Sequence, residues 1–322
     1  MARRFALWML LLLASILLLL SLILAYFSCK DYDQEFTDKK GKLAAVSLEP
    51  AGKSGEAEKY WLRLQGDGGL LAECGLLVPP DRANRYPAFV VLGGKATGKY
   101  AVDYALGVKD VIIIAPDYPY EPRESYAVVD VLTDLPKIRT ALFDMVPSVE
   151  LALDYLWTRK DVDTGRVVLL GYSFGAPYVP ALASRDRRFA VAAMVYGAGD
   201  LQSWIRHNVR RYEGPLFSDF VGFLSGVLLR PLEPLRHIHN ISPTPFIMIN
   251  GEQDEQVPRR NVEMLFDAAR EPKRIVWLSS RHVNPRDTSL TRTIIRTLGH
   301  ELIELGVLPG MNTDARTSDL RR

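Results

Sequence analysis

Apolar residues form an unbroken run near the start of the chain. Residues 5–27 carry no charged side chain, and most of them are Leu, Ile, Ala or Phe. This run exceeds the roughly 20 residues that a helix needs to cross a bilayer. It is also longer than the apolar core of about 7–15 residues in a cleaved signal peptide. The pattern therefore predicts a single transmembrane helix within residues 1–28, used as an anchor or an uncleaved signal, rather than a buried core helix.

Shorter apolar segments follow a polar stretch. Residues 29–58 are polar, and we expect a linker there with one weak strand at residues 43–48. Short apolar runs bounded by turn residues then predict strands at residues 59–65, 70–78, 87–92, 111–115, 167–170, 190–196, 246–250 and 274–278. Apolar positions with helical spacing predict helices at residues 100–108, 138–159, 176–184 and 288–306.

Strands that alternate with helices predict an α/β fold with a mostly parallel, doubly wound sheet and helices on both faces. We expect one such domain at residues 59–307, with a loop at residues 116–137 and a polar tail at residues 308–322. Residues 200–241 interrupt the alternation, and they are interpreted either as a small cap insertion or as a helix with an irregular excursion. The cap and the loop are expected to line a pocket.

Composition narrows the class of protein. The chain has 322 residues with 48% hydrophobic content, which suffices for one large α/β domain. Lys and Arg number 40 and Asp and Glu 38, and no basic stripe indicates a nucleic-acid partner. The two cysteines, Cys29 and Cys74, form neither a disulfide framework nor a metal-ligand cluster. We therefore expect no metal, no cofactor and no nucleic acid.

Charges beside the apolar run predict its orientation. Arg3 and Arg4 precede it and acidic residues follow within residues 31–35, which favours a cytoplasmic N-terminus and a single-pass protein with its body on the extracytoplasmic side. Cleavage and lipidation at Cys29 is an alternative, disfavoured by the bulky side chains at residues 26–27. Both interpretations tether the body to a membrane.

One short motif carries chemistry. Residues 171–175 read Gly-Tyr-Ser-Phe-Gly directly after the apolar residues 167–170, which is the G-x-S-x-G pattern of a nucleophile elbow. In such an elbow a strand reverses sharply into a helix, and the serine at the apex has a strained backbone. The glycines leave room for the close turn. The motif predicts that Ser173 Oγ is raised above the sheet, where a base can reach it.

The order of elements around this motif resembles the α/β-hydrolase superfamily, over roughly residues 59–307. In that family a serine, an acid and a histidine follow in this order, each after a strand. The resemblance implies Asp254 as the acid, in a Gly-x-x-Asp-x-x-Val-Pro arrangement after residues 246–250, and His282 as the base. A serine hydroxyl needs an imidazole to take its proton, and a carboxylate fixes the tautomer of that imidazole.

Other acids compete with Asp254 for this role. Glu252 and Glu255 lie in the same loop, and Asp200 follows the preceding strand. These three remain alternatives at this stage.

The other histidines are interpreted as structural or solvated. His207, His237 and His239 fall in residues 200–241, and His300 lies within the last predicted helix. The His237-x-His239 pair lacks an accompanying carboxylate or cysteine set and does not predict a metal site.

Backbone N–H groups should stabilise an oxyanion intermediate. The resemblance implies the N–H of Phe174 as one donor, with the second in Gly93-Gly94-Lys95 after residues 87–92. Whether Gly94 or Lys95 donates is open, and a plain strand-to-helix turn is the alternative for the two glycines. The spacing of residues 94–99 does not fit a phosphate-binding loop.

Together these residues imply a serine hydrolase that cleaves esters, thioesters or amides through an acyl-serine intermediate. The body resembles the dienelactone-hydrolase and esterase branch more than the lipases, and a small-molecule or lipid-like acyl compound is the expected substrate. Alternatives are a catalytically silent binding or scaffold protein, and a peptidase or acyltransferase of the same fold. The acyl group, the leaving group and the oligomeric state are not encoded in any pattern we recognise.

Overall fold

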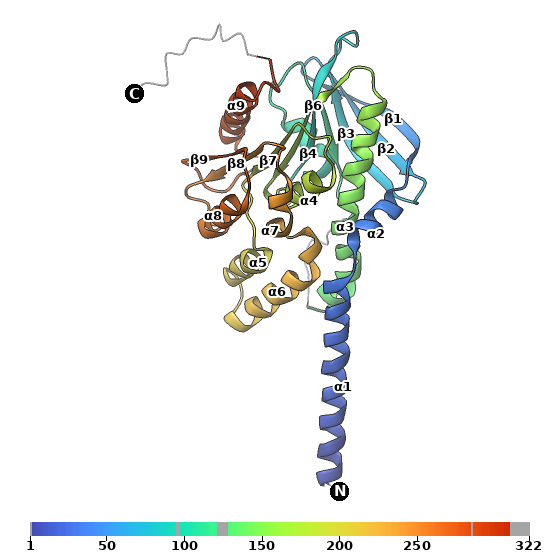
Figure 1. Cartoon of the computed structure of the whole chain (residues 1–322), viewed down its shortest axis with the longest axis vertical. Coiled ribbons are helices and arrows are strands. Elements are labelled where there is room, and N and C mark those ends of the chain that lie inside the picture. The colour runs from blue at the N-terminus through green and yellow to red at the C-terminus, as the bar shows by residue number, and fades with distance from the viewer. Residues whose placement is uncertain (1, 95–96, 121–127, 285, 310–322) are drawn as a thin grey trace.

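The computed structural model describes residues 2–94, 97–120, 128–284 and 286–309. Its centre is a nine-stranded sheet in the order β1-β2-β3-β5-β4-β6-β7-β8-β9, with helices packed on both faces (Figure 1). The strands are β1 (Leu43–Ser54), β2 (Ala57–Gly66), β3 (Leu71–Val78), β4 (Tyr86–Leu92), β5 (Ile112–Pro116), β6 (Val162–Tyr172), β7 (Val191–Val195), β8 (Phe246–Gly251) and β9 (Lys273–Leu278). The predicted fold class is confirmed.

The sheet is parallel where the predicted site lies. β5, β4, β6, β7, β8 and β9 run parallel to one another, whereas β1, β2 and β3 form an antiparallel extension that joins β5. β4, β5, β7 and β8 are buried along their whole length, which explains their continuous apolar sequences. Because parallel strands end at one edge, residues that follow β6, β8 and β9 are brought together there.

Helices on the two faces bury separate apolar clusters. One cluster includes side chains of α2 (Tyr32–Lys40), α3 (Val128–Thr158), α4 (Tyr178–Arg185) and α8 (Arg259–Ala268). The other is built with the 3-10 helix η1 (Gly98–Tyr104) and with α9 (Thr288–Glu304). The predicted helices at 100–108, 138–159, 176–184 and 288–306 correspond to η1, α3, α4 and α9.

The segment expected to be a linker, residues 29–58, is mostly structured. It contains α2 and the whole of β1, which extends beyond the expected weak strand at residues 43–48. Tyr32 and Phe36 of α2 are 5% and 4% exposed, and their rings lie 5.0 Å and 5.9 Å from that of Phe143. Aromatic burial therefore fixes this segment on α3, although its sequence is polar.

The loop expected at residues 116–137 is shorter than predicted. α3 begins at Val128 and continues through Pro136 and Pro147. Each proline removes one helical hydrogen bond, but the helix is buried along residues 145–153 against the sheet. Burial on both sides of Pro147 keeps the helix continuous there, whereas Pro136 is exposed.

Residues 200–241 form a helical insertion between β7 and β8. It consists of α5 (Leu201–Arg210), α6 (Pro215–Leu228), α7 (Pro234–His237) and the 3-10 helices η3 (Arg230–Leu232) and η4 (Ile238–Asn240). α5 packs against α6, and α7 packs against α4. That this insertion caps a binding site stays a prediction.

The N-terminal helix α1 (Ala2–Cys29) extends away from the body (Figure 1). Its segment Leu7–Phe27 is long and apolar enough to cross a membrane, although a signal sequence satisfies the same criterion. Where α1 meets the body, the Arg139 guanidinium lies 4.5 Å from the ring of Phe27 and 4.2 Å from that of Phe143. This contact joins the end of α1 to α3.

Candidate active site

The backbone turns sharply at Ser173, between β6 and α4. Ser173 has a φ of 53°, which is a strained conformation for a residue with a side chain. A Cβ on Gly171 would lie 2.6 Å from the carbonyl oxygen of Gly175, and one on Gly175 would lie 2.3 Å from that of Leu92. Both glycines are therefore required by close backbone approaches, as the motif predicts.

The structure brings together three side chains that are distant in the sequence. Ser173 Oγ lies 2.8 Å from His282 Nε2, and His282 Nδ1 lies 2.7 Å from Asp254 Oδ2. The side chains of His282 and Asp254 are 12% and 3% exposed. This chain of hydrogen bonds lets the imidazole accept the serine proton while the carboxylate holds the Nδ1 proton.

Backbone groups hold the Asp254 carboxylate in place. Its other oxygen, Oδ1, accepts hydrogen bonds from the N–H groups of Gln256 at 2.7 Å and Val257 at 3.1 Å. The insertion supports the same loop, because Trp204 Nε1 and Asn208 Nδ2 each donate to the carbonyl oxygen of Gln256 at 2.8 Å. The acid is therefore oriented by its own loop and by α5.

The competing acids lie elsewhere. The side chain of Glu255 is 61% exposed and lies 3.5 Å from Arg211 and 3.7 Å from Arg281, and Glu252 is exposed. Asp200 accepts a hydrogen bond from the N–H of Ser203 and begins α5. The acid that hydrogen-bonds to His282 is Asp254.

Tyr118, which the sequence analysis did not identify, contacts the residues that follow β4 and β6. Tyr118 Oη donates to the carbonyl oxygen of Gly93 at 2.6 Å, and its ring meets that of Phe174 edge-on at 5.1 Å. Burial raises the pKa of Tyr118 well above its ordinary value, so the hydroxyl keeps its proton. The side chain thus links the loop after β4 to the residue after Ser173.

The expected oxyanion donors lie beside this tyrosine. Phe174 follows Ser173 and its side chain is exposed, while Gly94 directly follows the carbonyl that Tyr118 holds. The carbonyl oxygen of Gly94 accepts from the N–H of Thr97 at 2.9 Å. Lys95 lies outside the described residues.

A second tyrosine lies against the base. The ring of Tyr196 meets that of His282 edge-on at 5.6 Å, and its hydroxyl hydrogen-bonds to Ser280 Oγ. Tyr196 is fully buried at the end of β7 with a φ of 53°. Tyr196 directly follows the buried strand β7. This position at the carboxyl end of a parallel strand is the sequence signal that could have identified it.

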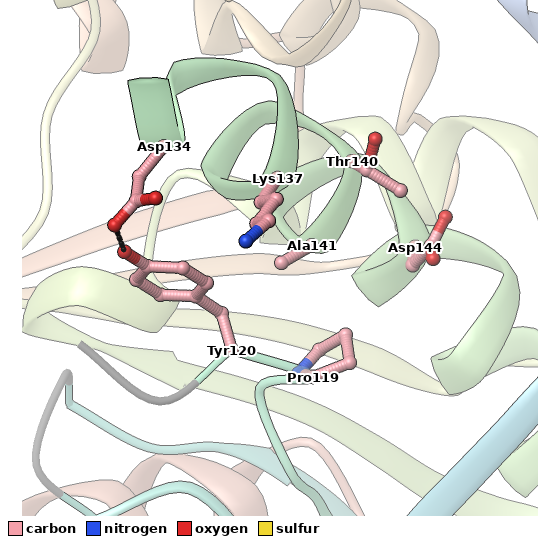
Figure 2. A pocket seen from close by; sticks show the side chains of 7 residues that line it. All are labelled: Pro119, Tyr120, Asp134, Lys137, Thr140, Ala141 and Asp144. Carbon is pink, nitrogen blue, oxygen red and sulfur yellow. Dashed lines mark hydrogen bonds between the residues drawn. The ribbon is translucent and has the colours of Figure 1, made fainter. Parts of the chain in front are cut away.

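A cavity of about 530 Å³ opens beside the segment that follows β5 (Figure 2). Its lining consists of Pro119, Tyr120, Asp134, Lys137, Thr140, Ala141 and Asp144. Tyr120 Oη lies 3.5 Å from Asp134 Oδ2 at one side of it. The lining includes residues of 116–137 but neither the triad residues nor the insertion at 200–241. That the loop and the insertion line a substrate pocket at Ser173 stays a prediction.

The remaining histidines make ordinary contacts. His207 Nε2 hydrogen-bonds to the carbonyl oxygen of Glu255 at 2.9 Å and His237 Nε2 to that of Pro231 at 2.7 Å. His239 is exposed, and the side chain of His300 is 70% exposed beside Glu304. Within the described ranges, no group of three or more His, Cys, Asp or Glu side chains could hold a metal ion.

Comparison with known proteins identifies the superfamily. A model of the prolyl oligopeptidase family matches residues 146–286, a range that includes Ser173, Asp254 and His282. Acetyl xylan esterase 1 from Thermoanaerobacterium sp. has a similar structure, with a TM-score of 0.63 at 15% identity over 87% of this chain and 94% of that one. The acetyl xylan esterase from Paenibacillus sp. R4 gives a TM-score of 0.59 at 16% identity over 83% and 94%.

The chain belongs to the α/β-hydrolase superfamily. This α/β-hydrolase is 33% identical to the uncharacterized protein YfhR of Salmonella typhi over 131 residues, or 39% of the chain and 43% of YfhR. It is 27% identical to the α/β hydrolase domain-containing protein WAV2 of Arabidopsis thaliana over 136 residues, or 40% of the chain and 44% of WAV2. The α/β-hydrolase chain thus matches less than half the length of these curated relatives.

Proposed function

We propose that this chain is a membrane-tethered serine hydrolase that cleaves carboxylic esters through an acyl-serine intermediate. The observation that carries the proposal is the hydrogen-bonded series Ser173–His282–Asp254 at the strained turn after β6. Strained backbone conformations of this kind cluster at functional sites, which supports a catalytic role for the serine.

Each residue has a defined part in the proposed reaction. Ser173 Oγ attacks the ester carbonyl carbon as its proton passes to His282 Nε2, and the N–H of Phe174 with that of Gly94 or Lys95 stabilises the oxyanion. The tetrahedral intermediate expels the alcohol, which takes the proton from His282. Water then attacks the acyl-serine, giving its proton to His282, and the acid leaves as Ser173 is regenerated. Asp254 orients the imidazole throughout.

Ester chemistry is favoured by the nature of the similar structures. Two of them are acetyl xylan esterases that cover more than four fifths of this chain. The esterase part of the expected branch is consistent with such neighbours, and the likeness to dienelactone hydrolases stays a prediction. We propose a small-molecule or lipid-like acyl substrate, without assigning its acyl group.

The tether rests on α1. The segment Leu7–Phe27 has 21 residues, which span about 31 Å as a helix, close to the thickness of a bilayer core of about 30 Å. Arg3 and Arg4 before it favour a cytoplasmic N-terminus. The body then acts on the extracytoplasmic side.

Peptide hydrolysis is the second candidate. The match of residues 146–286 to the prolyl oligopeptidase family favours it, and the acyl-serine route is the same for an amide. Peptide substrates and esters therefore need to be compared on the same enzyme.

The decisive experiment is labelling with a fluorophosphonate, which reacts with an activated serine. We expect the full-length protein in detergent to be labelled and the Ser173→Ala variant not to be, with an unchanged thermal unfolding midpoint. Ser289→Ala, a matched change at an exposed serine, should retain full labelling. Equal labelling of wild type and Ser173→Ala would refute the proposal. A panel of p-nitrophenyl esters of rising chain length and a set of prolyl peptides then separate the two candidate activities.

A further inference from the structure

The helix α6 of the insertion exposes large apolar side chains. Leu216 is 88% exposed, Phe217 46%, Phe220 60% and Phe223 50%. These four residues, named here the α6 face, lie on one helix of 14 residues. Isolated exposed apolar residues are common, but a contiguous group of this kind marks an interaction surface.

The opposite side of α6 is fixed against α5, so this face cannot rotate inward. Ser218, Gly222 and Gly226 follow one another at spacings of four, which places them on one side of the helix. A Cβ on Gly222 would lie 2.8 Å from Arg206 Cβ, and one on Gly226 would lie 2.7 Å from Gln202 Oε1. The small residues thus allow α5 to pack closely against α6, and the aromatic residues of the α6 face point to solvent.

The α6 helix also packs against α1, the candidate membrane span. Figure 1 shows α6 beside the upper part of α1, at the end of the body from which α1 extends. The contact between Arg139 and Phe27 joins the end of the span to α3 of the body. A bilayer crossed by Leu7–Phe27 therefore has its surface next to α6.

Charge around the helix suits a lipid surface. Arg210 and Arg211 lie at the C-terminal end of α5 and Arg230 lies just after α6, and all three are exposed. Arg206 lies within α5, on the side that packs against α6. Arg206 lies 3.6 Å from Asp219 and Arg211 lies 3.5 Å from Glu255. Arginines beside an apolar helix face are typical of helices that lie in the headgroup region, where they meet lipid phosphates.

We propose that α6 is a second membrane contact, which lies in the lipid interface with the α6 face directed into the bilayer. Its 14 residues extend about 21 Å, too short to cross about 30 Å of hydrocarbon, so the helix lies along the surface. The inference rests on the membrane tether of the proposed function. It assigns the face to lipid rather than to a second copy of the chain, because α6 is beside the span where headgroups gather.

Depth-dependent quenching of a fluorescent label tests this assignment. Full-length protein carrying Cys29→Ser is given one new cysteine at a time and labelled with an environment-sensitive dye, since Cys74 is buried. The three positions are Phe220→Cys on the α6 face, Leu17→Cys within the span, and Arg296→Cys on α9. Each protein is reconstituted into phosphatidylcholine–phosphatidylglycerol vesicles with nitroxides placed either near the headgroup or near the end of the acyl chain.

We expect the label at position 220 to lose most emission with headgroup-proximal nitroxides, because interfacial helices lie about 5–10 Å into the acyl boundary. The label at position 17 should respond most to the deep nitroxides, and the label at position 296 to neither. Circular dichroism verifies that each variant is folded.

The outcomes separate the two proposals. Quenching at position 17 without quenching at position 220 overturns the assignment of α6 while leaving the tether intact. Absence of quenching at both positions refutes the tether and this inference with it. Energy transfer between labels at position 220 on different chains, growing with protein density and without lipid quenching, identifies a second copy as the occupant and also overturns it. Fluorophosphonate labelling is independent of all three results.

Discussion

Tyr118 donates a hydrogen bond of 2.6 Å from its hydroxyl to the carbonyl oxygen of Gly93. The peptide unit that begins with this carbonyl ends with the N–H of Gly94, and a trans peptide directs the two groups to opposite sides. A side chain that holds the carbonyl therefore also aims the N–H. We therefore infer that Tyr118 positions the N–H of Gly94, which is one of the expected oxyanion donors.

Replacing Tyr118 by Phe removes that hydrogen bond and little else. We expect kcat for p-nitrophenyl acetate to fall about 10-fold, equivalent to about 1.4 kcal/mol of transition-state stabilisation, with KM changed little. An unpartnered buried carbonyl costs about 1–3 kcal/mol, so the thermal midpoint should also fall. Steady-state kinetics and thermal unfolding measure the two effects.

Tyr178→Phe is the matched control. Among the described residues, its buried hydroxyl has no hydrogen-bond partner, and its ring lies 6.5 Å from that of Tyr118. We expect its kcat to equal that of the wild type. If Tyr118→Phe loses stability but keeps its kcat, the tyrosine is structural and does not position the donor.

Asp254→Asn tests the assignment of the acid. The amide retains the shape of the side chain but no longer stabilises the protonated imidazole, so kcat should fall by about 10³–10⁴-fold. Glu255→Gln changes an exposed acid in the same loop and should leave kcat unchanged, because surface ion pairs contribute little. A large loss of kcat in Glu255→Gln with little loss in Asp254→Asn would reverse the assignment.

His237 predicts a pH dependence of stability. Burial lowers its pKa below the ordinary 6.5, against the opposing effects of the Pro231 carbonyl and of Asp33. As the pH falls, the unfolded chain therefore takes up the His237 proton before the folded protein does. The contribution of neutral His237 to the free energy of unfolding is complete above pH 6.5, and it is lost as the pH falls through the lower pKa of the folded protein.

His237→Gln should flatten this decline in the thermal midpoint at acidic pH, because the amide does not titrate. His300→Gln changes an exposed histidine and should keep the wild-type slope. Thermal unfolding of the full-length proteins in detergent measures these slopes. The pH is varied from about 7 to about 5 in steps of ~0.5, a range that includes the ordinary histidine pKa. Parallel curves for wild type and His237→Gln would contradict this reasoning.

The parallel part of the sheet could be predicted because each of its strands has a sequence signal of its own. Strands such as β5 and β8 are buried on both faces, which forces continuous apolar runs that the sequence displays. Once those runs are located, their carboxyl ends share one edge. The resemblance to the α/β-hydrolase order of serine, acid and histidine then selected Ser173, Asp254 and His282 at those strand ends, and the structure brings them within hydrogen-bonding distance.

The N-terminal part of the body could not be predicted in the same way. Two aromatic side chains, Tyr32 and Phe36, fix α2 on α3, and they lie among polar residues that show no apolar period. α3 likewise begins before Pro136, although local rules place a boundary there. Tyr118 was missed because its role depends on a carbonyl 25 residues away.

The outer strand β1 has a consequence for the solubility of the chain. It pairs only with β2 in the described sheet, and Val46 and Leu48 are exposed on it. An unpaired strand edge of this length is a template on which another chain can add a strand and start an aggregate. Pro50 offers no N–H there, and the pairing register shifts between Pro50 and Gly52. An incoming strand could therefore not pair regularly beyond Pro50, which makes this edge a poor template for aggregation.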